Sequence, residues 1–141
     1  MNFENEFSLK FKALSCNEGF ARMAVSVFLL PYDTYSDIMN DIKTAVSEAV
    51  TNSIIHGYEG MDGYVYIRCG VKDNVVYIEV SDNGCGIDDI KKAMEPLYTS
   101  KPSEERSGLG FTVMESFMDT VEVESEKNKG TRVFMSKSLL R

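Results

Sequence analysis

The sequence predicts an α+β fold, a two-layer sandwich in which helices cover one face of a mixed β-sheet. Three observations lead to this expectation. Several segments place apolar residues at helical spacing, and several others alternate or concentrate β-branched residues as strands do. These segments follow the order strand, helix, helix, two strands, two helices, two strands. Finally, the 141 residues contain no repeat and no linker, so we expect a single domain over residues 1–141.

The first half of the chain predicts one strand and two helices. Alternating apolar and polar residues over 7–13 predict a half-buried strand. A helix is expected to begin at Asn17 and to end at a proline, with these residues on its apolar face: Phe20, Met23, Ala24, Val27 and Phe28. Thr34 and Asp37 have capping-box spacing, which predicts the start of a long helix that ends near Gly57.

The second half predicts two hairpins separated by a polar segment and a helix. The hairpins are expected to pair residues 64–68 with 75–80 and residues 121–125 with 131–135. A short helix is expected to start at 88–89. Residues 96–108 lack periodicity and contain prolines, which is typical of a surface loop or a lid. A helix resumes at Gly110.

The composition excludes several classes of protein. A net charge of −7 repels phosphate backbones, so direct nucleic-acid binding is not expected. No apolar run is long enough to span a membrane, and the N-terminal segment lacks the apolar region of a signal peptide, which indicates a cytoplasmic protein. Three widely spaced cysteines and one histidine predict neither a disulfide framework nor a zinc site.

A first cluster of polar residues lies on the long predicted helix. Glu48, Asn52 and His56 are four residues apart, so their side chains lean toward one side of the helix. An Asn oxygen suits Mg²⁺, which keeps several waters, and a nearby Glu can act as a general base. The alternative is that Glu48 is a solvated helix residue and that His56 caps the helix end.

Two glycine-containing clusters have the chemistry of a nucleotide site. Asp82 follows a strand, where its carboxylate can accept a hydrogen bond from a base amino group, and Gly84 and Gly86 let the main chain approach a ligand. Residues 108–110 join the polar loop to a helix, whose first N–H groups can bind an anion beside Arg106. A plain turn and a flexible hinge are the alternatives.

The last cluster and two missing motifs complete the pattern. Gly130 and Thr131 precede the final strand, where the threonine hydroxyl could touch a ligand or simply belong to a hairpin turn. The chain has no GxxxxGK[ST] motif and no HRD or DFG motif. A P-loop protein and a eukaryotic-type kinase are therefore excluded, and another fold must hold any nucleotide.

Taken in order, the four clusters resemble the N, G1, G2 and G3 boxes of the GHKL superfamily. Residues 48–52 correspond to the N box, 82–86 to the G1 box and 108–110 to the G2 box. Over nearly its whole length the chain also resembles the sporulation-type anti-sigma F factors, which are serine kinases of this superfamily. The resemblance is carried by residues 17–22, 48–58 and 105–114.

The resemblance implies a role for each site residue. Asn52 would ligate Mg²⁺, and Glu48 would take the proton from the substrate serine. The residues implied to bind ATP or ADP are Asn52, His56, Asp82, Gly84, Gly86, Arg106, Ser107, Gly108, Leu109, Gly110 and Thr131. Asp82, helped by Thr131, would hold the adenine amino group, and residues 97–110 would form a lid over the phosphates. Arg22 and Arg106 would contact protein partners.

The resemblance also implies a function. The family acts as a homodimer, holds sigma F inactive, and phosphorylates an anti-anti-sigma protein. Alternatives are a general-stress switch kinase that holds another sigma factor, a nucleotide-gated binding module without catalysis, and a simple ATPase. The presence of Glu48 favours a kinase over a binding module, because binding alone requires no general base.

Overall fold

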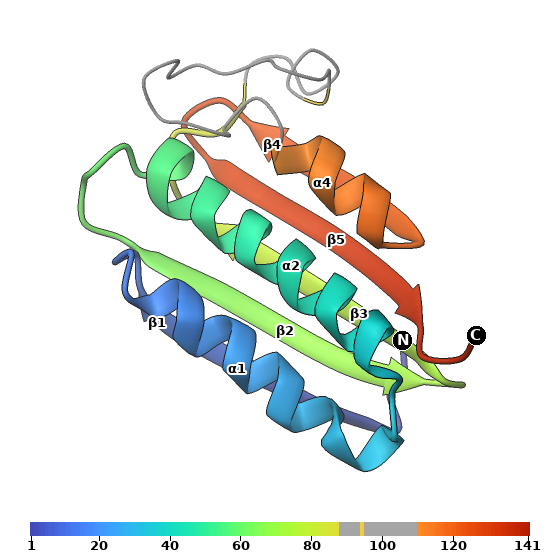
Figure 1. Cartoon of the computed structure of the whole chain (residues 1–141). Helices are drawn as coiled ribbons and strands as arrows, with labels where there is room; N and C mark the ends of the chain where they lie inside the picture. The colour runs from blue at the N-terminus through green and yellow to red at the C-terminus, as the bar shows by residue number, and fades with distance from the viewer. Residues whose placement is uncertain (88–93, 95–109) are drawn as a thin grey trace.

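The computed structural model describes residues 1–87, Met94 and residues 110–141. Its five-stranded sheet has the order β1-β2-β3-β5-β4. The strands are β1 Asn5–Lys12, β2 Tyr64–Lys72, β3 Val75–Asp82, β4 Thr120–Glu126 and β5 Gly130–Ser138. Helices cover one face of the sheet, as Figure 1 shows, so the predicted α+β sandwich is confirmed.

The strand directions correct one detail of the prediction. All four pairings between neighbouring strands are antiparallel, so the sheet is antiparallel where a mixed sheet was expected. The strand β4 does run parallel to β3, as the helical connection between them suggests. However, β5 lies between these two strands and pairs antiparallel with both.

The helices of the covering layer are α1 Asn17–Leu29, α2 Ser36–Asn52 and α4 Gly110–Phe117. A short 3₁₀ turn, Leu30–Tyr32, follows α1, and a π-helical turn, Ser53–Gly57, follows α2. The helix α2 lies over the centre of the sheet and contributes fully buried Ile42, Val46 and Val50 to the core. In the part of the chain that the structure describes, no helix has the length and apolar character needed to cross a bilayer.

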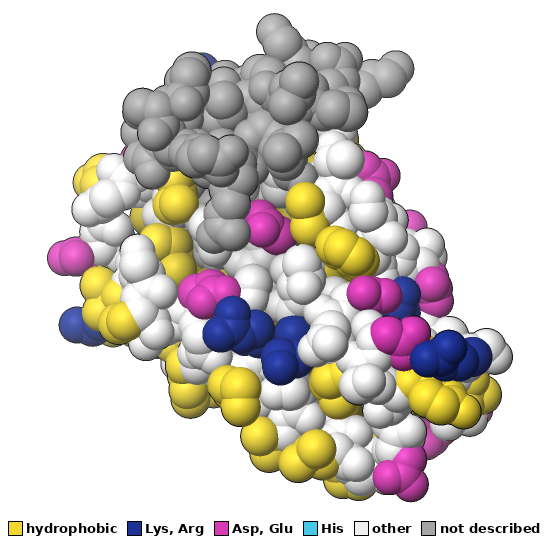
Figure 2. Space-filling model, viewed as in Figure 1, with side chains coloured by type: hydrophobic (Ala, Val, Ile, Leu, Met, Phe, Trp, Pro, Cys, Tyr) yellow, Lys and Arg dark blue, Asp and Glu magenta, His cyan; other side chains and the backbone are white. Residues whose placement is uncertain are grey.

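The predicted apolar face of α1 is only partly right, because Phe28 packs half-buried against the core but most of the buried face is made by other residues. The helix buries Ala21, Val25 and Leu29, whereas Phe20 and Met23 are each 52% exposed. Both faces of α1 carry apolar residues at helical spacing, so periodicity alone cannot tell which one meets the sheet. The helix therefore leaves an apolar stripe on the surface, visible along α1 in Figure 2.

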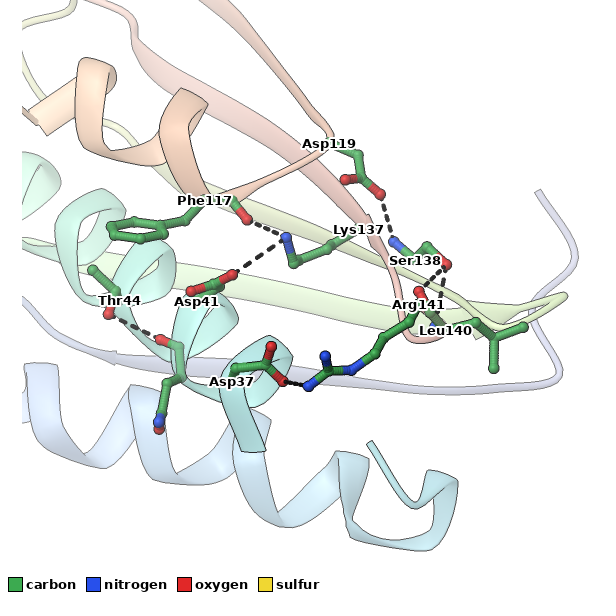
Figure 3. Close-up of polar contacts among 10 residues, drawn as sticks. Asp37, Asp41, Thr44, Phe117, Asp119, Lys137, Ser138, Leu140 and Arg141 are labelled. Atoms are coloured by element: carbon green, nitrogen blue, oxygen red, sulfur yellow. Dashed lines mark hydrogen bonds and ion pairs between the residues drawn. The ribbon is translucent and has the colours of Figure 1, made fainter. Parts of the chain in front are cut away.

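The predicted capping box at the start of α2 is wrong. The N-cap position is Tyr35, and no side chain caps the helix there. The Thr34 hydroxyl is buried without a hydrogen-bond partner among the described residues. The Asp37 carboxylate instead accepts a hydrogen bond from Arg141 at 2.8 Å, which ties the C-terminus to α2 (Figure 3).

A half-buried lysine stabilises the C-terminal end of α4. Lys137 of β5 donates a hydrogen bond of 2.6 Å to the carbonyl oxygen of Phe117 and lies 3.6 Å from the Asp41 carboxylate of α2 (Figure 3). A cation at a helix C-terminus also interacts favourably with the helix dipole. This contact fixes the C-terminal end of α4, and its first residue, Gly110, lies at the functional site.

Candidate functional site

The π-helical turn after α2 changes the direction of the side chains that follow. In this turn the amide of Tyr58 donates to the carbonyl oxygen of Ser53 at 3.2 Å, a bond between residues five apart. Turns of this kind are frequent at functional sites, because the extra residue shifts the register of the helix. Here Ser53 and His56 line the same cavity as Asn52.

This cavity has a volume of about 50 Å³. Among its lining residues are five that the sequence clusters single out: Asn52, His56, Asp82, Gly86 and Thr131. They come from α2 and the turn after it, from the end of β3 and the loop beyond it, and from β5. The fold therefore brings Asn52 of the N box together with Asp82 and Thr131, which are far apart in the sequence, whereas Glu48 is not among the residues that line this cavity.

Asp82 is the buried acceptor of the site. It is the last residue of β3 and is 5% exposed. Burial raises the pKa of its carboxyl group, while hydrogen bonds from the Gly84 amide, the Ser53 side chain and the Thr131 main chain oppose that shift. The Gly84 amide donates to Asp82 Oδ1 at 2.9 Å. The carboxylate is thus held in one orientation at the wall of the cavity.

Two glycines beyond Asp82 are required by the protein's own main chain. A Cβ on Gly84 would lie 2.0 Å from the carbonyl oxygen of Gly57, and one on Gly86 would lie 2.0 Å from that of Glu126. Gly86 also has a φ of +74°, which side chains rarely adopt. These contacts bring the loop after β3 against the π-turn and the β4–β5 hairpin.

Asn52 and Gly110 meet although 58 positions separate them in the sequence. A Cβ on Gly110 would lie 2.7 Å from Asn52 Nδ2. That amide nitrogen is buried and has no hydrogen-bond partner among the residues that the structure describes. A buried donor of this kind is costly unless a ligand or water satisfies it. The start of α4 and the end of α2 therefore frame a polar position suited to an anionic ligand.

Thr131 belongs to a small hydroxyl network that the sequence did not reveal. Its hydroxyl lies 2.8 Å from the Ser125 hydroxyl, which donates to the carbonyl oxygen of Gly130 at 2.9 Å. Ser125 also accepts a hydrogen bond of 2.7 Å from the amide of Ile87. Ser125 had no recognisable motif, because its role depends on the pairing of β4 with β5.

The proposed general base lies one helical turn before Asn52. Glu48 is 8% exposed, so the alternative of a solvated helix residue is excluded. Asn52 provides a single amide oxygen, which agrees with the preference of Mg²⁺ for few protein ligands and several waters. In the described part of the chain, no three His, Cys, Asp or Glu side chains converge as a metal cage.

Comparison with known proteins identifies the family. Residues 17–137 match the family model of the histidine kinase-like ATPase domain. An anti-sigma F factor of Clostridium botulinum (strain Eklund 17B / Type B) is 60% identical over 136 residues, which cover 96% of this chain and 95% of the relative. One of Clostridium acetobutylicum is 58% identical over 134 residues, or 95% and 94% of the two chains. This chain belongs to the anti-sigma F factor family.

A solved structure supports the same fold for this family member. The RsbU and RsbW domains of a Mycobacterium tuberculosis protein superpose with a TM-score of 0.69 at 16% sequence identity. The match covers 95% of the present chain and 32% of the other one. At this identity the likeness concerns the fold alone.

The remaining predicted site residues of this anti-sigma F factor family member lie elsewhere. Arg106, Ser107, Gly108 and Leu109 fall outside the described residues, as does most of the predicted lid 97–110. Arg22 lies on α1, away from the lining of the cavity. Its guanidinium forms an ion pair of 3.0 Å with Glu18 and a hydrogen bond of 3.5 Å with the Ser47 hydroxyl.

Proposed function

We propose that this chain, acting as a single domain in the cytoplasm, is an ATP-dependent anti-sigma factor and serine kinase. With ATP bound it would inhibit a sigma factor of the sigma F type, and it would phosphorylate an anti-anti-sigma protein. The observation that carries the proposal is the convergence of Asn52, Asp82 and Thr131 on one cavity in a histidine kinase-like ATPase domain. The relatives' name, anti-sigma F factor, supports the regulatory part.

Adenine recognition would depend on Asp82. Its carboxylate can only accept hydrogen bonds, and the exocyclic amino group of adenine donates them. The three hydrogen bonds that already hold this carboxylate keep its orientation fixed, which favours one base over others. Thr131, beside it on β5, would add a hydroxyl contact. Gly84 and Gly86 would let the loop after β3 pack tightly beside the base.

The phosphates of ATP or ADP and their Mg²⁺ would lie where α2 meets α4. Asn52 would ligate the ion with its amide oxygen, and the first N–H groups of α4, beginning at Gly110, would face the anionic oxygens. The amide nitrogen of Asn52, which is buried and has no hydrogen-bond partner among the described residues, would donate to a phosphate oxygen. The metal would neutralise phosphate charge, and residues 106–109 would complete the enclosure.

Phosphoryl transfer would then require a base for the incoming hydroxyl. Glu48 would accept the proton of the partner's serine while the serine oxygen attacks the γ-phosphorus and ADP leaves. The proton goes to the Glu48 carboxylate, and the transferred phosphoryl group forms the new ester bond. Its buried position near Asn52 supports this role, because a base must be close to the reacting phosphate.

Partner proteins would bind outside the nucleotide cavity. Arg22 lies on α1 and is held by Glu18, so its guanidinium is already oriented. Its contact with Ser47, the residue before Glu48, connects this surface to the catalytic region. We propose that Arg22, with Arg106 of the segment 97–110, contacts the sigma factor and the anti-anti-sigma protein.

A second copy of the chain would cover the outer side of α1. Four large apolar side chains are exposed on this helix and the turn after it: Phe20 52%, Met23 52%, Val27 58% and Leu30 66%. The strand β1 next to it forms one edge of the sheet. Exposed apolar patches and strand edges commonly mark protein interfaces, which supports the proposed homodimer.

Radiolabelled ATP with Mg²⁺ and a purified anti-anti-sigma protein tests the kinase proposal. Replacing Glu48 with Gln keeps the shape of the side chain but removes its basicity. The rate of phosphorylation should fall by about 10²–10⁴-fold while ATP affinity and sigma-factor capture persist. Glu115→Gln on the exposed side of α4 is the matched control and should keep the native rate.

Other outcomes separate the alternatives. An unchanged rate in Glu48→Gln would exclude Glu48 as the base. Phosphate release without any labelled partner identifies a simple ATPase, and nucleotide binding without transfer or hydrolysis identifies a binding module. Capture of only a general-stress sigma factor would identify the other switch kinase.

A further inference from the structure

The hydroxyl of Tyr58 connects two segments of the sheet at the edge of the cavity. Tyr58 directly follows the π-turn and is 9% exposed. Its phenol oxygen accepts a hydrogen bond of 2.8 Å from the amide of Asn83 and donates one to the carbonyl oxygen of Tyr64. Burial raises the pKa of Tyr58, so the phenol keeps the proton that it donates at neutral pH.

This bridge holds the main chain immediately after Asp82. Asn83 is the next residue, so its amide belongs to the peptide bond that carries the Asp82 carbonyl. Two positions further on, the amide of Cys85 donates to the carbonyl oxygen of Gly57 at 2.7 Å. The adjacent residues Gly57 and Tyr58 therefore hold both ends of the short loop whose middle amide, from Gly84, binds the Asp82 carboxylate.

The Tyr58 ring has little freedom to move. A Cβ on Gly63 would lie 2.2 Å from Cε1 of the ring, so the ring packs directly on the main chain there. With the ring fixed on Gly63 and the hydroxyl fixed at Tyr64, the Asn83 amide has one defined position. Because this amide belongs to the peptide bond that follows Asp82, its fixed position also restricts where the Asp82 side chain can lie.

We propose that Tyr58 is a positioning residue that sets the base selectivity of the cavity, by fixing the loop so that the Asp82 carboxylate faces a 6-amino group. The inference rests on the proposed binding of adenine by Asp82. A rigid acceptor favours an amino group and repels the 6-oxo group of inosine. An acceptor on a loosened loop loses that preference, because it can turn toward water.

The test compares the affinities of ATP and ITP, two nucleotides that differ at position 6 of the base. Calorimetry on the full chain with Mg²⁺ gives both dissociation constants for the wild type, Tyr58→Phe and Tyr66→Phe. Tyr58→Phe removes only the bridging hydroxyl. It should lower the preference for ATP over ITP about tenfold, mainly by lowering the affinity for ATP. This is the effect expected from the loss of one hydrogen bond to a charged group. Tyr66→Phe, in a half-buried strand position, should keep the wild-type preference.

A purely structural role predicts a different result. In that case the substitution would weaken the binding of ATP and of ITP in equal proportion. Either that result or an unchanged preference for ATP overturns the inference for Tyr58. If the wild type itself binds neither nucleotide, or does not prefer ATP, the proposed adenine site fails and the inference fails with it. Should Tyr58→Phe not fold, Gly63→Ala replaces it, because the added methyl displaces the ring but keeps the hydroxyl. The same loss of preference is expected, and an intact preference there overturns the proposal.

Discussion

Gly57 and Asp82 lie so close together at the cavity that even a methyl group on Gly57 would make a tight contact with the Asp82 carboxylate. A Cβ on Gly57 would lie 3.0 Å from Cγ and from both carboxylate oxygens of Asp82. The glycine that ends the π-turn therefore limits where the carboxylate can be. Nucleotide affinity should consequently be sensitive to a single methyl group at position 57.

Replacing Gly57 with Ala should push the Asp82 carboxylate out of place. We expect overpacking of about 1–3 kcal/mol to reduce the free energy of unfolding, the ATP affinity, or both. Urea unfolding and calorimetry measure the two effects separately. Gly19→Ala is the control, because its Cβ would meet only an ordinary contact of 3.7 Å with Arg22. Equal ATP affinity and stability in wild type and Gly57→Ala would contradict the tight contact.

The buried charge of Asp82 gives opposite effects on binding and on stability. Asp82→Asn replaces an acceptor with an amide that also presents donors, so ATP binding should weaken by about 1.5–3 kcal/mol. Because burial raises the folded-state pKa of Asp82, the ionised carboxylate destabilises the folded chain at neutral pH. The ligand-free variant should therefore melt at a higher temperature than the wild type at pH 7.

The stability prediction for Asp82→Asn is tested by the pH dependence of the difference in melting temperature between the variant and the wild type. The folded state binds the Asp82 proton more tightly than the unfolded state, so its unfavourable contribution is complete above the folded pKa. It disappears as the pH falls below the unfolded pKa. The melting temperatures of wild type and Asp82→Asn should converge on acidification. A constant difference from pH 7 to pH 4, or unchanged ATP affinity, contradicts the assignment.

Short-range sequence motifs identified residues of the cavity, but they did not identify the contacts between distant segments or the buried face of α1. Asp82 and Gly86 were accessible to sequence reasoning because a strand end followed by glycines has a local chemical meaning. Tyr58 and Ser125 were not, because each acts through a partner more than five residues away that only the folded sheet brings near. The buried face of α1 was predicted only partly correctly for a similar reason. Both faces of this helix are apolar, and only the folded structure shows which one the sheet covers.

The Arg22 proposal separates nucleotide binding from partner binding. Arg22→Ala should leave ATP affinity unchanged, because the guanidinium contacts Glu18 and Ser47 and no residue that lines the cavity. Capture of the sigma factor and of the anti-anti-sigma protein should weaken by at least about tenfold, as expected for an oriented arginine at an interface. Pull-down experiments and surface plasmon resonance measure the affinity of the variant for both partner proteins.

Arg68→Ala is the matched control for Arg22→Ala. Arg68 also pairs with a glutamate, Glu6, at a similar distance of 3.1 Å, but it lies on the sheet. Partner capture should remain at the wild-type level in this variant. Normal capture by Arg22→Ala, or an equal loss in both variants, would contradict a specific role for Arg22.

The homodimer proposal can be tested on the apolar stripe of α1. Val27 is 58% exposed, so Val27→Glu should change the free energy of unfolding by less than about 0.5 kcal/mol. In a dimer the same carboxylate would be buried without a partner, which is strongly unfavourable. Sedimentation equilibrium should therefore shift from a dimer toward the 15.8 kDa monomer. The control is Met61→Glu: Met61 lies after the π-turn and is even more accessible, at 75% exposed, and this variant should remain dimeric. If Val27→Glu associates as tightly as the wild type, the apolar stripe of α1 is not the interface. If the wild type itself is a monomer at micromolar concentration, the homodimer proposal is wrong.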